Sequence, residues 1–236
     1  IEQIGSGGFG TVFRAHDPIL KREVAVKIPR EGRLNRQEVA SLLREARAAA
    51  RLKHPGIVQI YDAGMQEEQA YIACELVNGP SLRKHLAQHS VSVGQAAAIC
   101  RRVAEALQHA HDLGVIHRDL NPSNILLDAE ENPYITDFGL ARDEAEEVHE
   151  RDLCFAGTLA YMSPEQLRGG GSPAAAASDI YSLGVVLFEM LTGRCPFTGQ
   201  AAELLRQIRE TPVPHPRQLN SRVPRDLEAI CLKCLA

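Results

Sequence analysis

A turn cluster at Asn78-Gly79-Pro80 divides the chain into two parts whose hydrophobic patterns differ. Before it, β-branched and apolar residues alternate as they do in strands, and after it apolar residues recur at helical spacing. A chain of 236 residues is long enough to bury a sizeable core. We therefore predict an α+β fold of two lobes: a small β-rich lobe with one main helix over residues 1–78, and a larger, mostly helical lobe over residues 79–236.

The expected elements follow from the same patterns. The first lobe should contain a hairpin around the glycine-rich stretch Gly5–Gly10, further strands over Glu23–Ile28, Ile57–Asp62 and Ala70–Leu76, and a helix over Asn35–Leu52. The second lobe should contain helices over Ser81–Gln88, Val93–Leu113, Ser178–Leu191, Ala201–Glu210 and Pro224–Leu235, and a short strand pair near Ile125–Leu127 and Tyr134–Thr136. Gly169–Ala177 is a low-complexity loop, and Thr211–Pro216 is a proline-rich connection.

The charge balance and the cysteines disfavour several classes of protein. The net charge of −4 provides no basic field for nucleic acid or an anionic membrane. No apolar run approaches the roughly 20 residues of a transmembrane helix, so we expect any membrane anchor to lie outside this chain. Six scattered cysteines are typical of reduced thiols in a cytoplasmic protein. The lone C-x-x-C of Cys231 and Cys234 has helical spacing and no second ligand pair, which favours core positions over a zinc or redox site.

Two features of the first lobe are ambiguous when each is taken singly. Gly5–Gly10 has the pattern G-x-G-x-x-G, which serves either a tight hairpin or a lid whose backbone N–H groups approach phosphate oxygens. A strand follows it, whereas a dinucleotide-binding fingerprint would open a helix. Lys27 ends the apolar run Val24–Lys27, either as an edge lysine that reaches solvent or as a cation with a charged partner. Glu45 on the following helix is the candidate partner, and such a pair is suited to holding two phosphates.

The stretch Ile116–Asp128 (IHRDLNPSNILLD), followed by Asp137-Phe138-Gly139 and Ser163-Pro164-Glu165, resembles the eukaryotic-type (Hanks-type) protein kinase family. The resemblance runs over the whole chain, and its later segments are most similar to bacterial Ser/Thr protein kinases. It implies a bilobal protein-kinase-like fold, with residues 1–236 as a catalytic domain that lacks the last C-terminal helices. It also implies ATP and Mg²⁺ as cofactors and Ser or Thr hydroxyls of proteins as the phosphate acceptors.

The resemblance implies a role for each matching residue. Asp119 matches the base that accepts the substrate hydroxyl proton, and Asn124 and Asp137 match the magnesium ligands. Lys27 would hold the α- and β-phosphates while pairing with Glu45. The nucleotide-binding positions, which comprise the glycine lid, the apolar adenine slot and the hinge backbone, are Ile4, Gly5, Gly7, Gly10, Val12, Ala25, Lys27, Glu75, Val77 and Leu126. Cys74 falls at the gatekeeper position, and an apolar stack anchored by Asp179 is implied at Ala49, Ile60, His117 and Phe138.

The chain departs from the family pattern at Asn121, where Ser/Thr kinases carry a lysine that reaches the transferred phosphoryl group. Loss of that cation leaves two alternatives open, a kinase or a nucleotide-binding pseudokinase with weak or no turnover. A small-molecule kinase is disfavoured because such enzymes lack the segment from Gly157-Thr158 to Glu165 that shapes a peptide site.

The stretch from Gly139 to Gly157 contains no Ser, Thr or Tyr, although relatives place phosphoacceptors there. Within it, Asp143–Asp152 holds six carboxylates and one arginine. A solvated acidic loop is one interpretation. The hypothesis we favour is that these carboxylates replace phosphate as partners of Arg118, and of Arg44 or Arg47, so that the kinase needs no phosphorylation of this segment.

Overall fold

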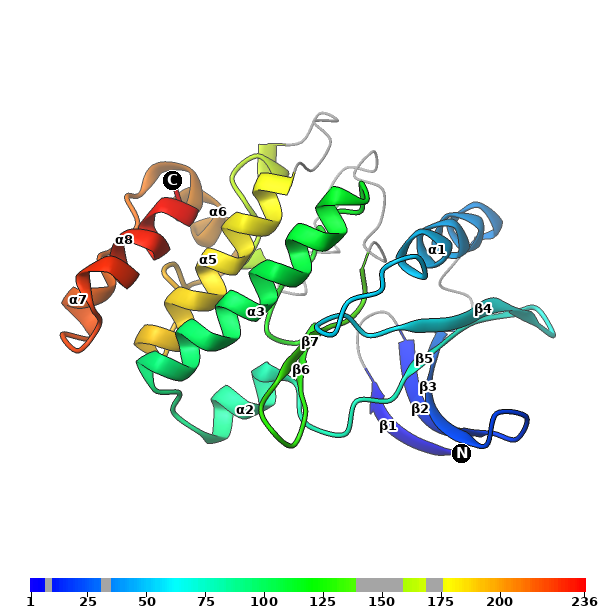
Figure 1. Cartoon of the computed structure of the whole chain (residues 1–236). Coiled ribbons are helices and arrows are strands. Elements are labelled where there is room, and N and C mark those ends of the chain that lie inside the picture. The colour runs from blue at the N-terminus through cyan, green and yellow to red at the C-terminus, as the bar shows by residue number, and fades with distance from the viewer. Residues whose placement is uncertain (7–9, 31–34, 139–158, 169–175) are drawn as a thin grey trace.

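The computed structural model describes residues 1–6, 10–30, 35–138, 159–168 and 176–236, and it has the two expected lobes (Figure 1). The first lobe is a five-stranded antiparallel sheet in the order β1-β2-β3-β5-β4. Its strands are β1 (Glu2–Ser6), β2 (Gly10–Asp17), β3 (Arg22–Pro29), β4 (Ile60–Gln66) and β5 (Gln69–Glu75).

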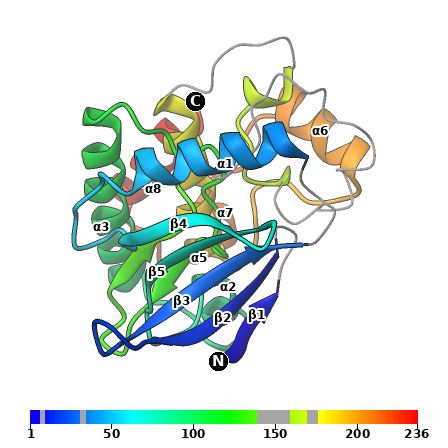
Figure 2. The ribbon, with the colours of Figure 1, turned by 90° about the vertical axis from the view of Figure 1, so that its right-hand side faces the viewer.

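Helix α1 (Arg36–Ala49) lies across this sheet (Figure 2). It begins with a capping box, because the Asn35 side chain accepts hydrogen bonds from the backbone of Gln37 and Glu38 while Glu38 accepts one from the Asn35 backbone. Its buried side, Leu42 and Ala46, packs with residues of β5 in a small apolar cluster. The helix is therefore attached to the sheet through its apolar face.

The second lobe is built around helices α3 (Val93–Asp112) and α5 (Ala176–Thr192). Helix α5 is buried over most of its length, as its nearly continuous apolar sequence predicts. The remaining elements are α2 (Leu82–Gln88), the strand pair β6 (Ile125–Leu127) and β7 (Pro133–Ile135), the 3₁₀ turn η2 (Gln166–Arg168), α6 (Ala201–Glu210), α7 (Pro216–Leu219) and α8 (Arg225–Cys234). Within the described ranges, no helix has the length and apolarity needed to cross a bilayer.

The C-x-x-C pair lies where α8 packs against α5. The Cys231 side chain is fully buried, and its thiol lies 3.6 Å from the Gly184 carbonyl of α5. A Cβ added at Gly184 would lie 2.7 Å from the Cβ of Cys234, so α5 and α8 approach closely there. Both cysteines are free, and the described residues contain no cluster of three or more metal-ligating side chains. The expected core position is confirmed for Cys231, whereas Cys234 is half-buried.

Several elements begin or end a few residues away from the predicted bounds, and two differences have a clear structural cause. Strand β4 begins at Ile60 rather than Ile57, because Val58 donates its backbone hydrogen bond to the Ile135 carbonyl of β7 at 2.9 Å instead of joining the sheet. A one-turn helix, α7, follows the proline-rich connection, where only a connection was expected. Pro216 occupies its first turn, the helical position at which proline is tolerated.

Candidate active site

The register of the sheet brings the first set of candidate residues to one face. In the paired strands, Val12 lies opposite Lys27, Lys27 opposite Ile72, and Ala25 opposite Cys74. Residues directly opposite each other in antiparallel strands project to the same side, and side chains two apart on one strand share a face. Val12, Ala25, Lys27 and Cys74 therefore project from the same face of the sheet.

Lys27 joins this face to the helical lobe. Its Nζ donates to Oδ2 of Asp137 at 2.7 Å, and both side chains are largely buried. Asp137 has a positive φ of 65°, which is uncommon for a residue other than glycine and is typical of functional sites. The expected partner Glu45 accepts a hydrogen bond from Ser41 at 3.4 Å, and its pairing with Lys27 stays a prediction.

The loop that carries Asp119 is fixed by a buried carboxylate. Asp179 of α5 is fully buried, and its two oxygens accept backbone hydrogen bonds from His117 and Arg118, each at 2.8 Å. The ring Nε2 of His111 lies 2.7 Å from Oδ2 of Asp179. Burial raises the pKa of Asp179, but these hydrogen bonds outweigh it and hold the pKa below its ordinary value. Arg118 has a positive φ of 69°, so the chain turns sharply just before Asp119.

Two amide side chains hold the Asp119 carboxylate. Asn124 donates to the Asp119 carbonyl at 2.8 Å and to its Oδ2 at 3.1 Å. Asn121 donates to the same carbonyl at 3.0 Å and to Oδ1 at 3.1 Å. Burial raises the pKa of Asp119, against the charge of His117 and the two amide hydrogen bonds. A carboxylate with a raised pKa is a stronger proton acceptor, which suits a general base.

The predicted magnesium ligands fit a divalent cation. The Nδ2 of Asn124 and the Oδ2 of Asp137 already have partners, so Asn124 Oδ1 and Asp137 Oδ1 are the oxygens suited to a metal ion. No larger acidic cluster exists among the described residues. Mg²⁺ is usually bound through one or two protein carboxylates plus substrate phosphates, so this sparse ligand set is suited to a nucleotide-bound ion rather than to a permanent one.

Lys27 and Asp137 line a small cavity of about 30 Å³. Its walls include Ala49, Ile60 and Phe138, which are three of the four residues expected to form an apolar stack. The fourth, His117, has its ring centroid 4.8 Å from that of Phe138. Since the His117 backbone is also bonded to Asp179, the expected stack and its anchor lie together.

Cys74 also lines the cavity, at the gatekeeper position. Burial raises the pKa of its thiol to about 12, so the side chain is a neutral thiol at physiological pH.

The adenine-slot residues come from both lobes. Ala25 is buried, Val12, Val77 and Leu126 are half-buried, and Ile4 is exposed. The N–H of Glu75 donates to the Gln59 carbonyl at 2.8 Å, so its expected role in the hinge must come from its carbonyl.

The glycine lid is partly within the described ranges. Gly5 of β1 pairs with Val12 of β2. A Cβ at position 10 would lie 2.1 Å from the Ile28 carbonyl oxygen, so only glycine fits there. Gly7 lies outside the described residues.

Gln166 is a positioning candidate that sequence reasoning missed. Its Nε2 donates to the Arg118 carbonyl at 2.8 Å, while its Oε1 accepts from the Ser163 backbone at 3.0 Å. It therefore connects the segment after residue 158 to the loop that carries Asp119. Nearby, Glu165 accepts a hydrogen bond from the Ser178 hydroxyl at 3.1 Å.

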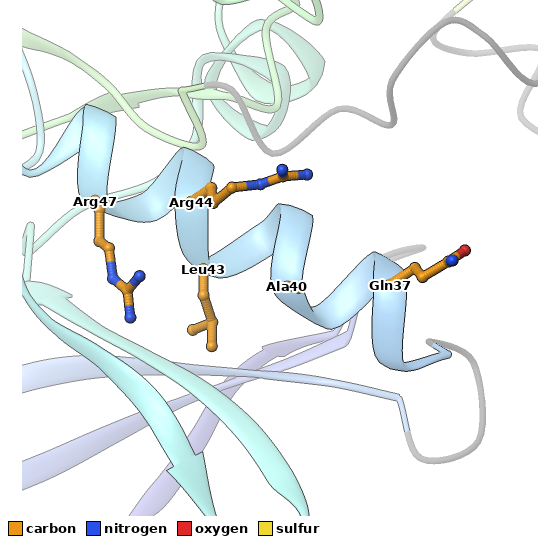
Figure 3. Close-up of a pocket in the computed structure, with 5 residues that line it drawn as sticks. All are labelled: Gln37, Ala40, Leu43, Arg44 and Arg47. Carbon is orange, nitrogen blue, oxygen red and sulfur yellow. The ribbon is translucent and has the colours of Figure 1, made fainter.

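A hollow of about 410 Å³ lies along α1 and is lined by residues of that helix (Figure 3). Its lining includes Arg44 and Arg47, the basic residues that the acidic-segment hypothesis invokes. The acidic segment Asp143–Asp152 itself lies outside the described residues, so that hypothesis stays a prediction.

A lysine on a β-sheet lobe that pairs with a carboxylate of a helical lobe, next to a second carboxylate held by two amides, is the arrangement of a bilobal phosphotransferase. The family comparison is specific: the protein kinase domain matches residues 1–236. The chain belongs to the protein kinase family.

Relatives include the Ser/Thr-protein kinase PrkC of Bacillus subtilis, 40% identical over 236 residues, which cover 99% of this chain and 36% of that protein. The Ser/Thr-protein kinase PknB of Mycobacterium leprae is 40% identical over 243 residues, 99% of this chain and 38% of that protein. The chain thus spans little more than a third of these relatives. Its fold resembles the crystal structure of the Mycobacterium tuberculosis PknI kinase domain, with a TM-score of 0.78 and 25% identity, covering 100% of this chain and 85% of that one.

Proposed function

We propose that this protein transfers the γ-phosphoryl group of ATP to Ser or Thr hydroxyls of protein substrates. The observation that supports the proposal is the Lys27–Asp137 pair at 2.7 Å, which sets a cation beside the carboxylate that we expect to hold Mg²⁺. Asp119 lies on the neighbouring loop with its carboxylate oriented by two amides. Phosphoryl transfer depends mainly on such positioning and charge, since it needs little covalent chemistry from the protein.

In this proposal each side chain has one task. Lys27 binds the α- and β-phosphates, and its positive charge offsets theirs. Asn124 and Asp137 would hold Mg²⁺, which when bound neutralises charge on the phosphate oxygens. Asp119 orients the acceptor hydroxyl and takes its proton. The apolar residues Val12, Ala25 and Leu126 enclose the adenine ring and keep water from it.

Transfer of radiolabelled phosphate from ATP to Ser-, Thr- and Tyr-containing peptides tests this function. We expect incorporation into Ser or Thr peptides that EDTA abolishes, and a loss of about 10²–10⁴ in kcat for Asp119→Asn. The matched control Asp112→Asn removes an exposed carboxylate at the end of α3 and should retain activity. Equal rates for Asp119→Asn and the control would refute the assignment of the base.

We propose further that the protein is cytoplasmic. The support is chemical: the five cysteines within the described residues are free, which fits a reducing compartment.

A further inference from the structure

The side-chain NH₂ group of Asn121 donates its hydrogen bonds to Asp119. Asn121 is 3% exposed, and both ends of its amide are used. Nδ2 donates to the carbonyl and to Oδ1 of Asp119, and Oδ1 of Asn121 accepts from the Ser123 backbone at 2.9 Å. The side chain is thus held on one side by the loop backbone and holds the carboxylate on the other.

The two amide side chains of the loop each donate a hydrogen bond to one oxygen of the Asp119 carboxylate. Asn121 bonds Oδ1 of Asp119 and Asn124 bonds Oδ2, both at 3.1 Å, and both also bond the Asp119 carbonyl. A carboxylate with one donor on each oxygen cannot rotate about its terminal bond without losing both hydrogen bonds. Each oxygen keeps a further lone pair for a proton donor.

A contact between Asn121 and the transferred phosphoryl group does not fit this arrangement. The side chain is short, neutral and buried, and its donors are already directed at Asp119. An amide also adds no charge, so it cannot replace a lysine electrostatically.

We propose that Asn121 is a positioning residue that fixes the orientation of the Asp119 carboxylate for proton transfer, a role that rests on the proposed kinase function. Orientation of a catalytic group is worth a large factor in rate, because a misplacement of about 1 Å can cost about 100-fold. At position 121, hydrogen bonds that orient Asp119 therefore take the place of the charge contact that the family lysine makes.

Steady-state kinetics of Asn121→Ala and Asn121→Asp tests the proposal. We expect Asn121→Ala to lower kcat about 10- to 100-fold while the KM values for ATP and peptide change less than about threefold. The isosteric Asn121→Asp keeps the shape but sets a second carboxylate against Asp119, so its loss of kcat should be larger. Unchanged kcat in both variants would overturn the proposal.

Asn220→Ala is the matched control for folding. Asn220 has the same bonding pattern far from the site, since it donates to the Leu191 carbonyl at 2.8 Å and accepts from the Arg222 backbone at 3.1 Å. Its removal should lower the melting temperature but leave kcat unchanged. A kcat loss equal to that of Asn121→Ala would mean that the effect is general destabilisation.

A double-mutant cycle with Asp119→Ala separates action through Asp119 from action on the phosphoryl group. If Asn121 acts only by orienting the carboxylate, Asn121→Ala should change the residual rate of the Asp119→Ala protein less than about twofold. The same fold-loss in both backgrounds would overturn the proposal. Absence of turnover in the wild-type protein would instead overturn the proposed function itself, so the two failures are distinguishable.

Discussion

Replacing Asp179 by asparagine removes one acceptor from the carboxylate that fixes the catalytic loop. Asp179 accepts backbone hydrogen bonds from His117 and Arg118 and lies 2.7 Å from the His111 ring. Asparagine has one acceptor oxygen, so its NH₂ group must face at least one of these buried donors. A hydrogen bond to a charged group contributes about 1.5–3 kcal/mol, and an unsatisfied buried N–H costs about 1–3 kcal/mol. We expect Asp179→Asn to lower the free energy of unfolding by about 3 kcal/mol.

Thermal unfolding measures this loss. For a chain of this length, about 3 kcal/mol corresponds to a fall in melting temperature of about 6–12 °C. The control Asp112→Asn should stay within about 0.5 kcal/mol of wild type, because Asp112 is an exposed surface residue. Since His117 and Arg118 directly precede Asp119, kcat should also fall, by about tenfold.

The pH dependence supplies a second test of the same carboxylate. Although burial raises the pKa of Asp179, its hydrogen bonds leave that pKa below the ordinary value. A depressed pKa contributes stability that is present above about pH 4 and is lost as the pH falls through the folded-state pKa. The difference in unfolding free energy between wild type and Asp179→Asn should therefore be constant near neutrality and shrink below about pH 4. A melting temperature equal to that of Asp112→Asn at pH 7 would refute the reasoning.

Three further outcomes are expected. Lys27→Met should lower kcat/KM for ATP by at least about 100-fold with the fold intact by circular dichroism, because it removes a cation from the phosphates; wild-type kinetics would contradict the site. Gln166→Glu should lower kcat about fivefold or more, since a carboxylate cannot donate to the Arg118 carbonyl. Steady-state assays with peptide measure kcat, and an unchanged value would contradict this role. Phosphatase treatment should leave activity unchanged, whereas Glu150→Gln/Asp152→Asn should reduce it at low salt. Activity lost on phosphatase treatment, or activity unchanged in the double mutant, would refute the acidic-segment hypothesis.

The fold was largely predictable because its signals are local. The turn cluster at 78–80, the capping residue Asn35 and the apolar run of α5 each mark an element by residues that are neighbours in sequence. The start of β4 was not predictable in this way. Val58 has the β-branched character of a strand, but its hydrogen bond goes to Ile135, 77 positions later, and only the tertiary structure decides which strand it joins.

The same distinction applies to the site: its motif residues could be named from the sequence, but the contacts of Asn121 could not. The family resemblance implied Asp119, Asn124, Asp137 and Lys27; in the structure Lys27 pairs with Asp137 and Asn124 bonds Asp119. The resemblance could not predict the partner of Asn121, because that partner depends on how the chain turns after Arg118, which has a positive φ. Comparison with the family lysine suggested only a missing charge, whereas the amide has three hydrogen bonds of its own.

Within the described residues, backbone contacts attach the ends of the sheet lobe to the helical lobe at two places. On one side, the Pro80 carbonyl accepts a hydrogen bond from Leu127 of β6 at 2.9 Å, and a Cβ at Gly79 would lie 1.9 Å from the Leu127 oxygen. The end of the hinge is therefore fixed to the helical lobe.

On the other side, the segment between α1 and β4 is also fixed to the helical lobe. Ile135 donates to the Gly56 carbonyl at 2.8 Å, and a Cβ at Gly56 would lie 3.3 Å from the Ala106 Cβ of α3. Together with the Lys27–Asp137 ion pair, these two attachments hold the sheet lobe against the helical lobe. Any rotation of the sheet lobe about the two attachments would change the Lys27–Asp137 distance, which is 2.7 Å in this structure.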